Sequence, residues 1–380
     1  MSICYVCGCT INNSNTYREH IILNSIGGKL ISPSIICKPC APSFDVIDAA
    51  LSYQLNFIGL MLNIERDRGK NPHIKATIIE TGEDIFLSSG GKPVQVKPTI
   101  RENPSDGSIH ITARDKKQMR DTLKGLKRKY PFIQNIEGLI NNAKKTENYF
   151  DKLVHHSLNI GGEEVFRSIC KMVVNFYMHN SGHREQILHL IPYIKDGKQQ
   201  DVVWYYYSDD VLDLNKEPIE ILHRLVVKAN SIEKLMYGYV ELFSTFKFLV
   251  LMSDDYTGED FHQFYYFDVL SRTTVESPIN LNLSREAVLK VLELKKNKLD
   301  ELKDALNRLM ALIKKKQTYD CISNIAQKSI DTSFQSLREG SVPSDEIIRA
   351  LIDNLSEGFA KFLYSQSRFH QEYPKNKNIE

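Results

Sequence analysis

Four cysteines near the start of the chain are spaced like the ligands of a metal ion. They form two Cys-x2-Cys pairs separated by twenty-nine residues, Cys4 with Cys7 and Cys37 with Cys40. A two-residue spacer lets both thiolates of a pair face one tetrahedral centre, and two such pairs complete a closed four-thiolate site. The pattern therefore predicts a structural zinc ion.

Two disulfides or a redox-active Cys-x2-Cys motif are the alternatives. The first residues lack a basic region followed by an apolar stretch, so no secretion signal points to an oxidising compartment. A redox motif would follow a strand of a βαβ unit and would not need to be duplicated. Zinc is favoured over both. The remaining cysteines, Cys9, Cys170 and Cys321, are interpreted as ordinary small buried residues.

The segment between the two pairs carries a Glu-His dipeptide, Glu19-His20, followed by apolar β-branched residues. This run predicts a short strand, and Gly27-Gly28 predicts a turn that leads the chain back toward the second pair. After Cys40, apolar residues recur every three or four positions across residues 45–65, which predicts a helix. The expected unit is a knuckle, a β-hairpin, a second knuckle and a helix.

In this order, these residues resemble the HNH endonuclease family with zinc knuckles, the ββα-metal nucleases. The resemblance covers residues 3–55. It implies that His20 is the general base that activates a water for attack on a phosphodiester. It also implies that Glu19 is a ligand of a catalytic Mg²⁺ or Mn²⁺ ion. Zinc would then hold the scaffold together and take no part in the chemistry.

One position departs from the family pattern. Such nucleases usually carry asparagine directly after the last knuckle cysteine, where it helps to hold the metal, and this chain has Ala41. Alanine has no donor atom. Asp45 or Asp48 at the start of the following helix could supply an oxygen instead, although Asp48 also suits a helix start by interacting with the helix dipole. Alternatively, the domain is a naturally inactive descendant, or the chain has been deliberately disabled.

Length and composition set the wider frame. The chain has 380 residues, of which 42% are hydrophobic and 25% charged, which is typical of a globular protein with two or three domains. No uncharged apolar run approaches the roughly 18 residues of a membrane span, so we expect a cytoplasmic protein with no membrane partner. Nucleotide-binding and hydrolase motifs such as a Walker A sequence are absent from the sequence.

A basic segment at residues 114–130 is a candidate nucleic-acid contact. Lys116, Arg120, Lys124 and Arg128 recur every four residues, which aligns them on one face of a helix, and an apolar stripe lies opposite. A row of cations can follow a phosphate backbone with salt-sensitive affinity. The alternative is a solvated surface face.

The rest of the chain alternates between strand and helix signals. Turn formers and short apolar runs in residues 66–110 predict a small antiparallel sheet, and residues 136–182 have a helical pattern. Aromatic-rich runs in residues 187–275 predict one meandering sheet with a buried face. Residues 285–316 predict one long helix with a near-heptad apolar seam, which could pack within the chain or form a homodimer.

These observations together predict an α+β protein. We expect an HNH nuclease module with structural zinc at 1–65, a small β region plus the basic helix at 66–135, and an α+β recognition, regulatory or oligomerisation region at 136–380. The expected function is a metal-dependent endonuclease acting on double-stranded DNA, in prokaryotic restriction or anti-phage defence, with an activating ligand or partner protein left open. The alternative is a non-catalytic, zinc-dependent protein that binds DNA or a partner.

Overall fold

The structure is a computed structural model. It describes residues 2–67, 69, 71–144, 152–198, 202–207, 215–276, 279, 281–338 and 340–372, with the backbone alone at 368–372. The chain divides into two compact units, each built from two segments. Unit 1 comprises residues 1–72 and 158–316, and unit 2 comprises residues 73–157 and 317–380. The α+β class is confirmed, and long helices do occupy the C-terminal part.

The N-terminal part of unit 1 has the predicted knuckle, hairpin and helix. Its elements are β1 (Glu19–His20), the 3-10 helix η1 (Asn24–Ile26), β2 (Ile31–Ser32), the 3-10 helix η2 (Ala41–Phe44) and α1 (Asp45–Met61). Strands β1 and β2 are antiparallel, with Glu19 opposite Ser32. The glycine pair makes the turn possible, because Gly27 has a φ of 97° and a Cβ on Gly28 would lie 2.0 Å from the Ile22 carbonyl oxygen.

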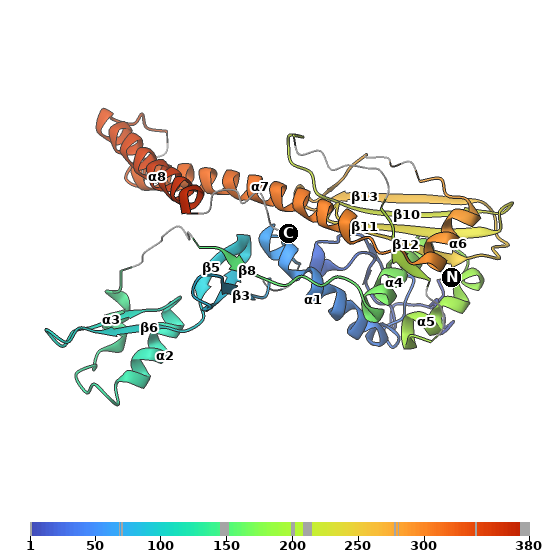
Figure 1. The fold of residues 1–380 in the computed structure, drawn as a ribbon, viewed down its shortest axis with the longest axis horizontal. Helices are drawn as coiled ribbons and strands as arrows, with labels where there is room; N and C mark the ends of the chain where they lie inside the picture. Colours follow the sequence, from blue (N-terminus) through green and yellow to red (C-terminus); the bar gives the residue numbers. More distant parts are fainter. Residues whose placement is uncertain are drawn as a thin grey trace. The chain divides into compact units, whose positions relative to one another are not determined.

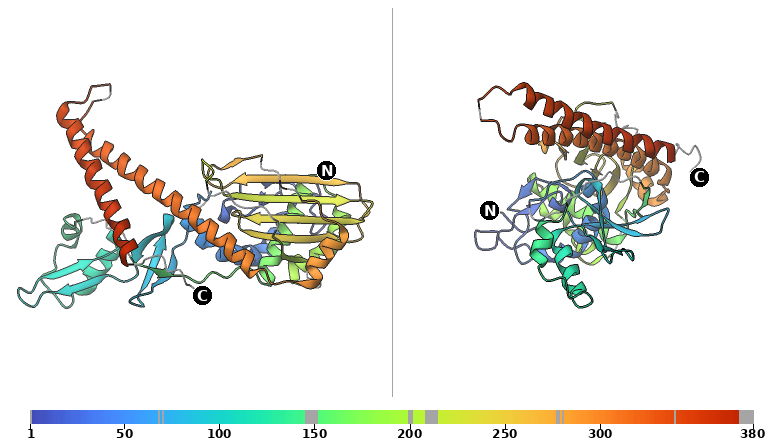
Figure 2. Two further views of the ribbon diagram at one scale, coloured as in Figure 1. Left: turned by 45° about the horizontal axis from the view of Figure 1, so that its top comes forward. Right: turned by 90° about the vertical axis from the view of Figure 1, so that its left-hand side faces the viewer.

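The main sheet of unit 1 is antiparallel, and its strands lie side by side in the left view of Figure 2. Its spatial order is β14-β13-β10-β11-β12-β9. Only β10, β11 and β12 form the predicted meander, since β13 returns to pair with β10 and β9 pairs with the far edge at β12. The bounds are β9 (Val203–Tyr205), β10 (Leu222–Asn230), β11 (Leu235–Leu242), β12 (Phe246–Ser253), β13 (Phe261–Asp268) and β14 (Thr273–Thr274).

Helix α4 (Glu163–His179) packs between the N-terminal segment and this sheet, in contact with α1 on one side and with β9 to β12 on the other (Figure 1). Its apolar residues join those of the knuckles, α1 and the sheet in a single core. The 3-10 helix η4 (Arg184–Leu190) and α5 (Ile191–Asp196) follow it. The first 72 residues are therefore not packed as a separate body within unit 1.

The predicted single helix at 285–316 is wrong, because the structure has two helices there. They are α6 (Arg285–Leu294) and α7 (Leu299–Ser333). Lys295 takes the left-handed conformation with a φ of 41°, and the Asn297 side chain accepts a hydrogen bond from the Leu299 amide at 3.0 Å. This polar Lys-Lys-Asn-Lys stretch ends one helix and starts the next. Residues 299–316 of α7 belong to unit 1, where Leu309 and Ile313 enter the core.

Unit 2 contains the predicted small antiparallel sheet, but as two sheets rather than one. One sheet has the order β5-β4-β3-β8, and the other pairs β6 with β7. Helix α8 runs back along the later part of α7, where the Asn354 amide donates to Ser333 Oγ at 3.0 Å (Figure 2). The bounds are β3 (Ile74–Ile78), β4 (Asp84–Ser88), the 3-10 helix η3 (Ser89–Gly91), β5 (Lys92–Gln95), β6 (Thr99–Glu102), β7 (Ile109–Thr112), α2 (Lys116–Leu126), α3 (Ile136–Asn141), β8 (Val154–His155) and α8 (Asp345–Glu372).

Among the described residues, no helix is both long enough and apolar enough to cross a membrane.

Candidate active site and metal centre

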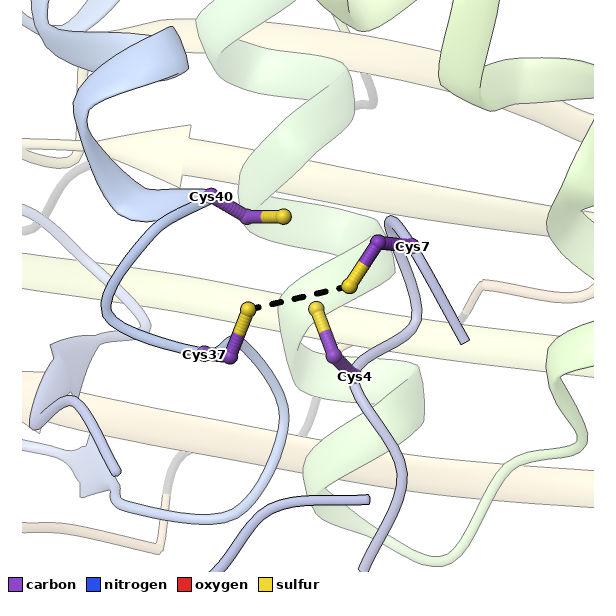
Figure 3. Close-up of side chains that lie close together, drawn as sticks. All are labelled: Cys4, Cys7, Cys37 and Cys40. Carbon is purple, nitrogen blue, oxygen red and sulfur yellow. Dashed lines mark hydrogen bonds between the residues drawn. The ribbon is translucent and has the colours of Figure 1, made fainter. Parts of the chain in front are cut away.

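The four knuckle cysteines converge on one point (Figure 3). Their sulfur atoms all lie within 4.8 Å of one another, and Cys7 Sγ lies 3.7 Å from Cys37 Sγ. Zinc–thiolate bonds of about 2.3 Å in a tetrahedron place the sulfurs about 3.8 Å apart, so the geometry fits a zinc ion. In the described part of the chain this is the one group of three or more His, Cys, Asp or Glu side chains close enough to hold a metal.

Backbone hydrogen bonds shape the two knuckles. The Gly8 amide donates to the Cys4 carbonyl at 2.8 Å, and the Cys40 amide donates to the Cys37 carbonyl at 3.0 Å. Arg184 then ties the first knuckle to the rest of unit 1, since its Nε donates to the Tyr5 carbonyl at 2.9 Å. The thiols are therefore held in place by turns and by a contact from a distant segment, as a structural site requires.

Glu19 and His20 point to opposite sides of strand β1, as the two-residue period of a strand requires. Glu19 is 6% exposed, whereas His20 is partly exposed. Both line an open pocket of about 210 Å³. Asp45 and Asp48 of helix α1 line the same pocket, so the two alternative carboxylates do reach the neighbourhood of the predicted catalytic pair.

His20 is held in an environment that favours a neutral imidazole. Burial lowers its pKa below the ordinary value of 6.5, although the nearby Asp67 carboxylate opposes this shift. Asp67 Oδ2 lies 3.5 Å from His20 Nε2, and that nitrogen makes no hydrogen bond of acceptable geometry. Lys29 Nζ donates to Asp67 Oδ1 at 2.5 Å, and Asn24 Nδ2 donates to Asp67 Oδ2 at 2.7 Å. A neutral, partly exposed imidazole beside a pocket can accept a proton.

Glu19 is not free to act as a ligand, because helix α4 engages its carboxylate. Lys171 Nζ lies 2.5 Å from Glu19 Oε1, and the Asn175 amide donates to the same oxygen at 3.2 Å. The Tyr5 hydroxyl, next to Cys4, donates in turn to Asn175 Oδ1 at 2.9 Å. Burial, followed by the charge of Glu19, raises the pKa of Tyr5 well above its ordinary value, so the hydroxyl stays protonated and remains a donor.

Asp48 is engaged from the same face of α4. Its Oδ2 lies 2.6 Å from Lys171 Nζ, and Ser168 Oγ donates to its Oδ1 at 2.9 Å. Burial on its own would lower the pKa of Lys171, but the charges of Asp48 and Glu19 outweigh that effect and raise the pKa above its ordinary value. Lys171 is therefore a fully buried ammonium that bridges two carboxylates. Its Nζ also lies 5.3 Å from the centre of the Phe44 ring.

A catalytic divalent ion does not fit the residues present in this arrangement. Ala41, where the family pattern has asparagine, is 6% exposed and offers no side-chain donor. Oε1 of Glu19, the residue that the resemblance assigns as a metal ligand, already contacts the Lys171 ammonium. The positive charge of the lysine also repels any further cation. The zinc centre fits its ion, and the second site does not.

The basic segment forms a helix, with one change from the prediction. Lys116, Arg120 and Lys124 lie on α2, whereas Arg128 comes after the helix has ended at Leu126. Lys116 and Lys124 are exposed. Arg120 forms a two-point salt bridge with Glu137 on α3. Its Nε and one Nη donate to the two carboxylate oxygens at 2.6 and 2.9 Å. These residues belong to unit 2, while the cysteines, Glu19 and His20 belong to unit 1.

Sequence reasoning missed Lys171, Asn175 and Asp67. A signal for the first two is present in the chain, since Lys171 and Asn175 interrupt an otherwise apolar run in a predicted core helix. A lysine at the centre of such a run is rarely buried without a carboxylate partner. Which carboxylate it meets is not visible locally, because Asp48 and Lys171 are 123 residues apart.

Comparison with protein families agrees with the resemblance carried by the N-terminal motifs. Residues 4–56 match the family model described as HNH endonuclease, which covers the knuckles, the Glu-His strand and most of α1. The match confirms the predicted HNH module at the N-terminus. Comparisons with curated proteins and with solved structures return no match for this chain.

Proposed function

We propose that this protein is an endonuclease that hydrolyses phosphodiester bonds of nucleic acid at the Glu19–His20 pocket, with double-stranded DNA as its substrate. The observation that carries the proposal is the position of these two residues on one strand between two zinc knuckles, in the segment that matches HNH endonucleases. The pocket beside them is open and could admit a phosphate group.

His20 is the general base in this proposal. The residue is partly exposed beside the pocket, and its lowered pKa keeps the imidazole neutral near neutral pH, which is the state that can accept a proton. The family depends on Mg²⁺ or Mn²⁺, and this chain offers an incomplete ligand set. We therefore expect the chain as it stands to cleave DNA slowly or not measurably.

Cleavage of supercoiled plasmid in Mg²⁺ or Mn²⁺ tests the proposal. The variants are Ala41→Asn, which restores a donor, and Ala41→Asn with Lys171→Met, which also frees Glu19 from its ion pair. We expect cleavage to appear in this series and to be abolished, by a factor of at least about 100, when His20→Ala is added. If no variant cleaves the plasmid while zinc is bound and the fold is intact, the proposed nuclease activity is overturned.

A role in restriction or anti-phage defence belongs to the same proposal, with residues 136–380 deciding when or where the module cuts. The matched segment is a small part of the chain, and the proposal assigns the recognition of a ligand, a partner protein or a second copy to the remainder. Phage plating on cells that carry the chain or its His20→Ala variant tests this role. Equal plating efficiency for both would contradict it.

A zinc-dependent protein that binds nucleic acid without cutting it is the second candidate. Ala41 and the occupied Glu19 carboxylate both favour it. The exposed cations Lys116 and Lys124 then carry the phosphate contacts, and replacing both by glutamine should weaken binding and lower the slope of log affinity against log salt by about 2. Lys361→Gln on α8 is the matched control and should leave the slope unchanged.

A further inference from the structure

The Glu19–Asp48 carboxylate pair already holds a cation, and that cation is part of the chain. Lys171 Nζ lies within 2.6 Å of one oxygen from each carboxylate. A divalent ion that used the same two oxygens, at about 2.0–2.1 Å for magnesium, would need the space that the ammonium nitrogen fills. The ammonium therefore excludes a divalent ion from these two oxygens by volume, and it opposes a divalent ion at the other carboxylate oxygens by charge.

The position of Lys171 is built into the core. Ser168, Lys171 and Asn175 project from one face of α4, and each contacts Asp48 or Glu19. The lysine side chain is 2% exposed, and α4 is packed against α1 and the main sheet. Since the pocket-lining residues include both carboxylates but not the lysine, the ammonium approaches them from the protein side. Metal entering from the pocket would meet two carboxylates that are already neutralised from behind.

We propose that Lys171 takes the place of the divalent ion at Glu19 and Asp48, so that the HNH module of this chain is kept in a metal-free state by an internal ammonium. The inference rests on the proposed function for its meaning, since it explains how a nuclease pocket is silenced. Ala41 contributes to the same state by removing a donor. The ligand chemistry that the lysine excludes is a hard divalent cation bound by oxygen.

Binding of Mn²⁺ to the zinc-loaded full chain tests the proposal without any reference to cleavage. Free Mn²⁺ is measured by electron paramagnetic resonance during a titration of the unchanged chain, Lys171→Met and Lys171→Met with Glu19→Gln. Two carboxylates are sufficient for a hard cation once the ammonium is removed. We expect Lys171→Met to bind one Mn²⁺ at least about tenfold more tightly than the unchanged chain, and the added Glu19→Gln to reverse the gain.

Lys247→Met is the matched control. Lys247 is also a buried lysine of unit 1, at 4% exposure, but it pairs with Glu241 in the main sheet. The Lys247→Met substitution removes a buried ammonium group that does not contact Glu19 or Asp48. It should therefore leave Mn²⁺ affinity unchanged. Equal Mn²⁺ affinity of the unchanged chain and a folded Lys171→Met chain would overturn the proposal, as would an equal gain in Lys247→Met.

Removing Lys171 leaves two carboxylates near one another and can unfold the protein. In that case thermal unfolding is followed with and without Mn²⁺, because an ion that binds only the folded state raises the melting temperature. The proposal expects Mn²⁺ to recover the fold of Lys171→Met and to have no such effect on Lys247→Met. Absence of recovery at millimolar Mn²⁺ would overturn it.

The two proposals fail in different ways. If Lys171→Met binds Mn²⁺ and no variant cuts DNA, the nuclease is overturned and the role of Lys171 stands. If the unchanged chain cuts DNA and Lys171→Met gains no Mn²⁺ affinity, the role of Lys171 is overturned and the nuclease stands.

Discussion

At the scale of single residues, substitution of Cys37 tests the zinc centre most directly. It is buried, and its sulfur lies 3.7 Å from that of Cys7 in the other knuckle. Cys37→Ser replaces a thiolate by a hydroxyl, which is a poor zinc ligand. We expect the zinc content to fall from one ion per chain to below about 0.1, and we expect the module to lose its fold because a structural zinc contributes folding free energy.

Zinc content is measured by atomic emission, and folding by circular dichroism and limited proteolysis. Cys321→Ser on α7 is the control, since it removes a thiol without touching the four-cysteine group. One zinc ion retained by Cys37→Ser with an unchanged melting temperature would contradict a structural four-thiolate site.

The residues that sequence alone could identify are those that act through local spacing. Cysteine pairs with two residues between them can be recognised from the sequence alone. The same holds for a Glu-His dipeptide before a glycine turn. Lys171 could not be assigned in this way, because its partners come from two distant segments and only packing brings them together. The departure at Ala41 was visible, but the cation that accompanies it was not.

At the scale of elements, a histidine links the main sheet to the N-terminal segment. His223 on β10 is fully buried, its Nε2–H donates to the Ile26 carbonyl at 2.9 Å, and its Nδ1 accepts from the Phe243 amide at 3.2 Å. This pairing requires a neutral imidazole with the proton on Nε2. Burial lowers the pKa of His223 to about 4, and the Ile26 and Asp268 oxygens offset only part of that effect.

This histidine makes the stability of unit 1 depend on pH in a definite direction. Above pH 6.5 the ring is neutral in both states and its full contribution is present. As the pH falls from 6.5 toward about 4, the unfolded chain takes up a proton that the folded chain refuses, so stability decreases, by roughly 3 kcal/mol in total. Urea unfolding of the unchanged chain and of His223→Gln, at pH 7 and pH 5, measures the effect.

His223→Gln should be less stable at pH 7, by about 1–3 kcal/mol, because it loses a buried hydrogen-bond pairing. It should also lose less stability on acidification than the unchanged chain does. Both chains share the same thiolates, so their difference isolates the histidine. His110→Gln, at an exposed position on β7, is the control. A pH dependence that is the same with and without His223 would contradict this account.

Element types followed from the sequence more readily than their arrangement. The hairpin, α1, α2 and most strands of the main sheet were predicted, because each depends on local periodicity. The return of β13 to β10 and the pairing of β9 with β12 depend on which apolar faces meet in the core, which no local pattern records. The break between α6 and α7 was missed because Lys295 continues the spacing of the predicted seam, whereas its backbone is left-handed.

At the scale of the whole molecule, the matched HNH segment shares its core with residues far along the chain. Buried side chains of the knuckles and α1 belong to the same cluster as those of α4, the main sheet and the first part of α7. The chain leaves unit 1 after residue 72 and returns to it at residue 158. The matched HNH segment therefore depends on later residues for the surface against which α1 is buried.

This organisation predicts that residues 1–72 do not fold alone, even with zinc. The isolated fragment keeps the four cysteines and binds the ion, but it loses the partner of α1, the Asn175–Glu19 contact and the Arg184 tie to the first knuckle. We expect one zinc per fragment, no cooperative thermal transition and rapid proteolysis of α1, against a cooperative transition in the full chain. A zinc-loaded fragment that unfolds cooperatively and resists protease would show instead that the module is autonomous. Since zinc binding alone cannot distinguish these results, protease resistance of α1 decides between them: the HNH site is completed by the chain that follows it only if that resistance is lost on excision.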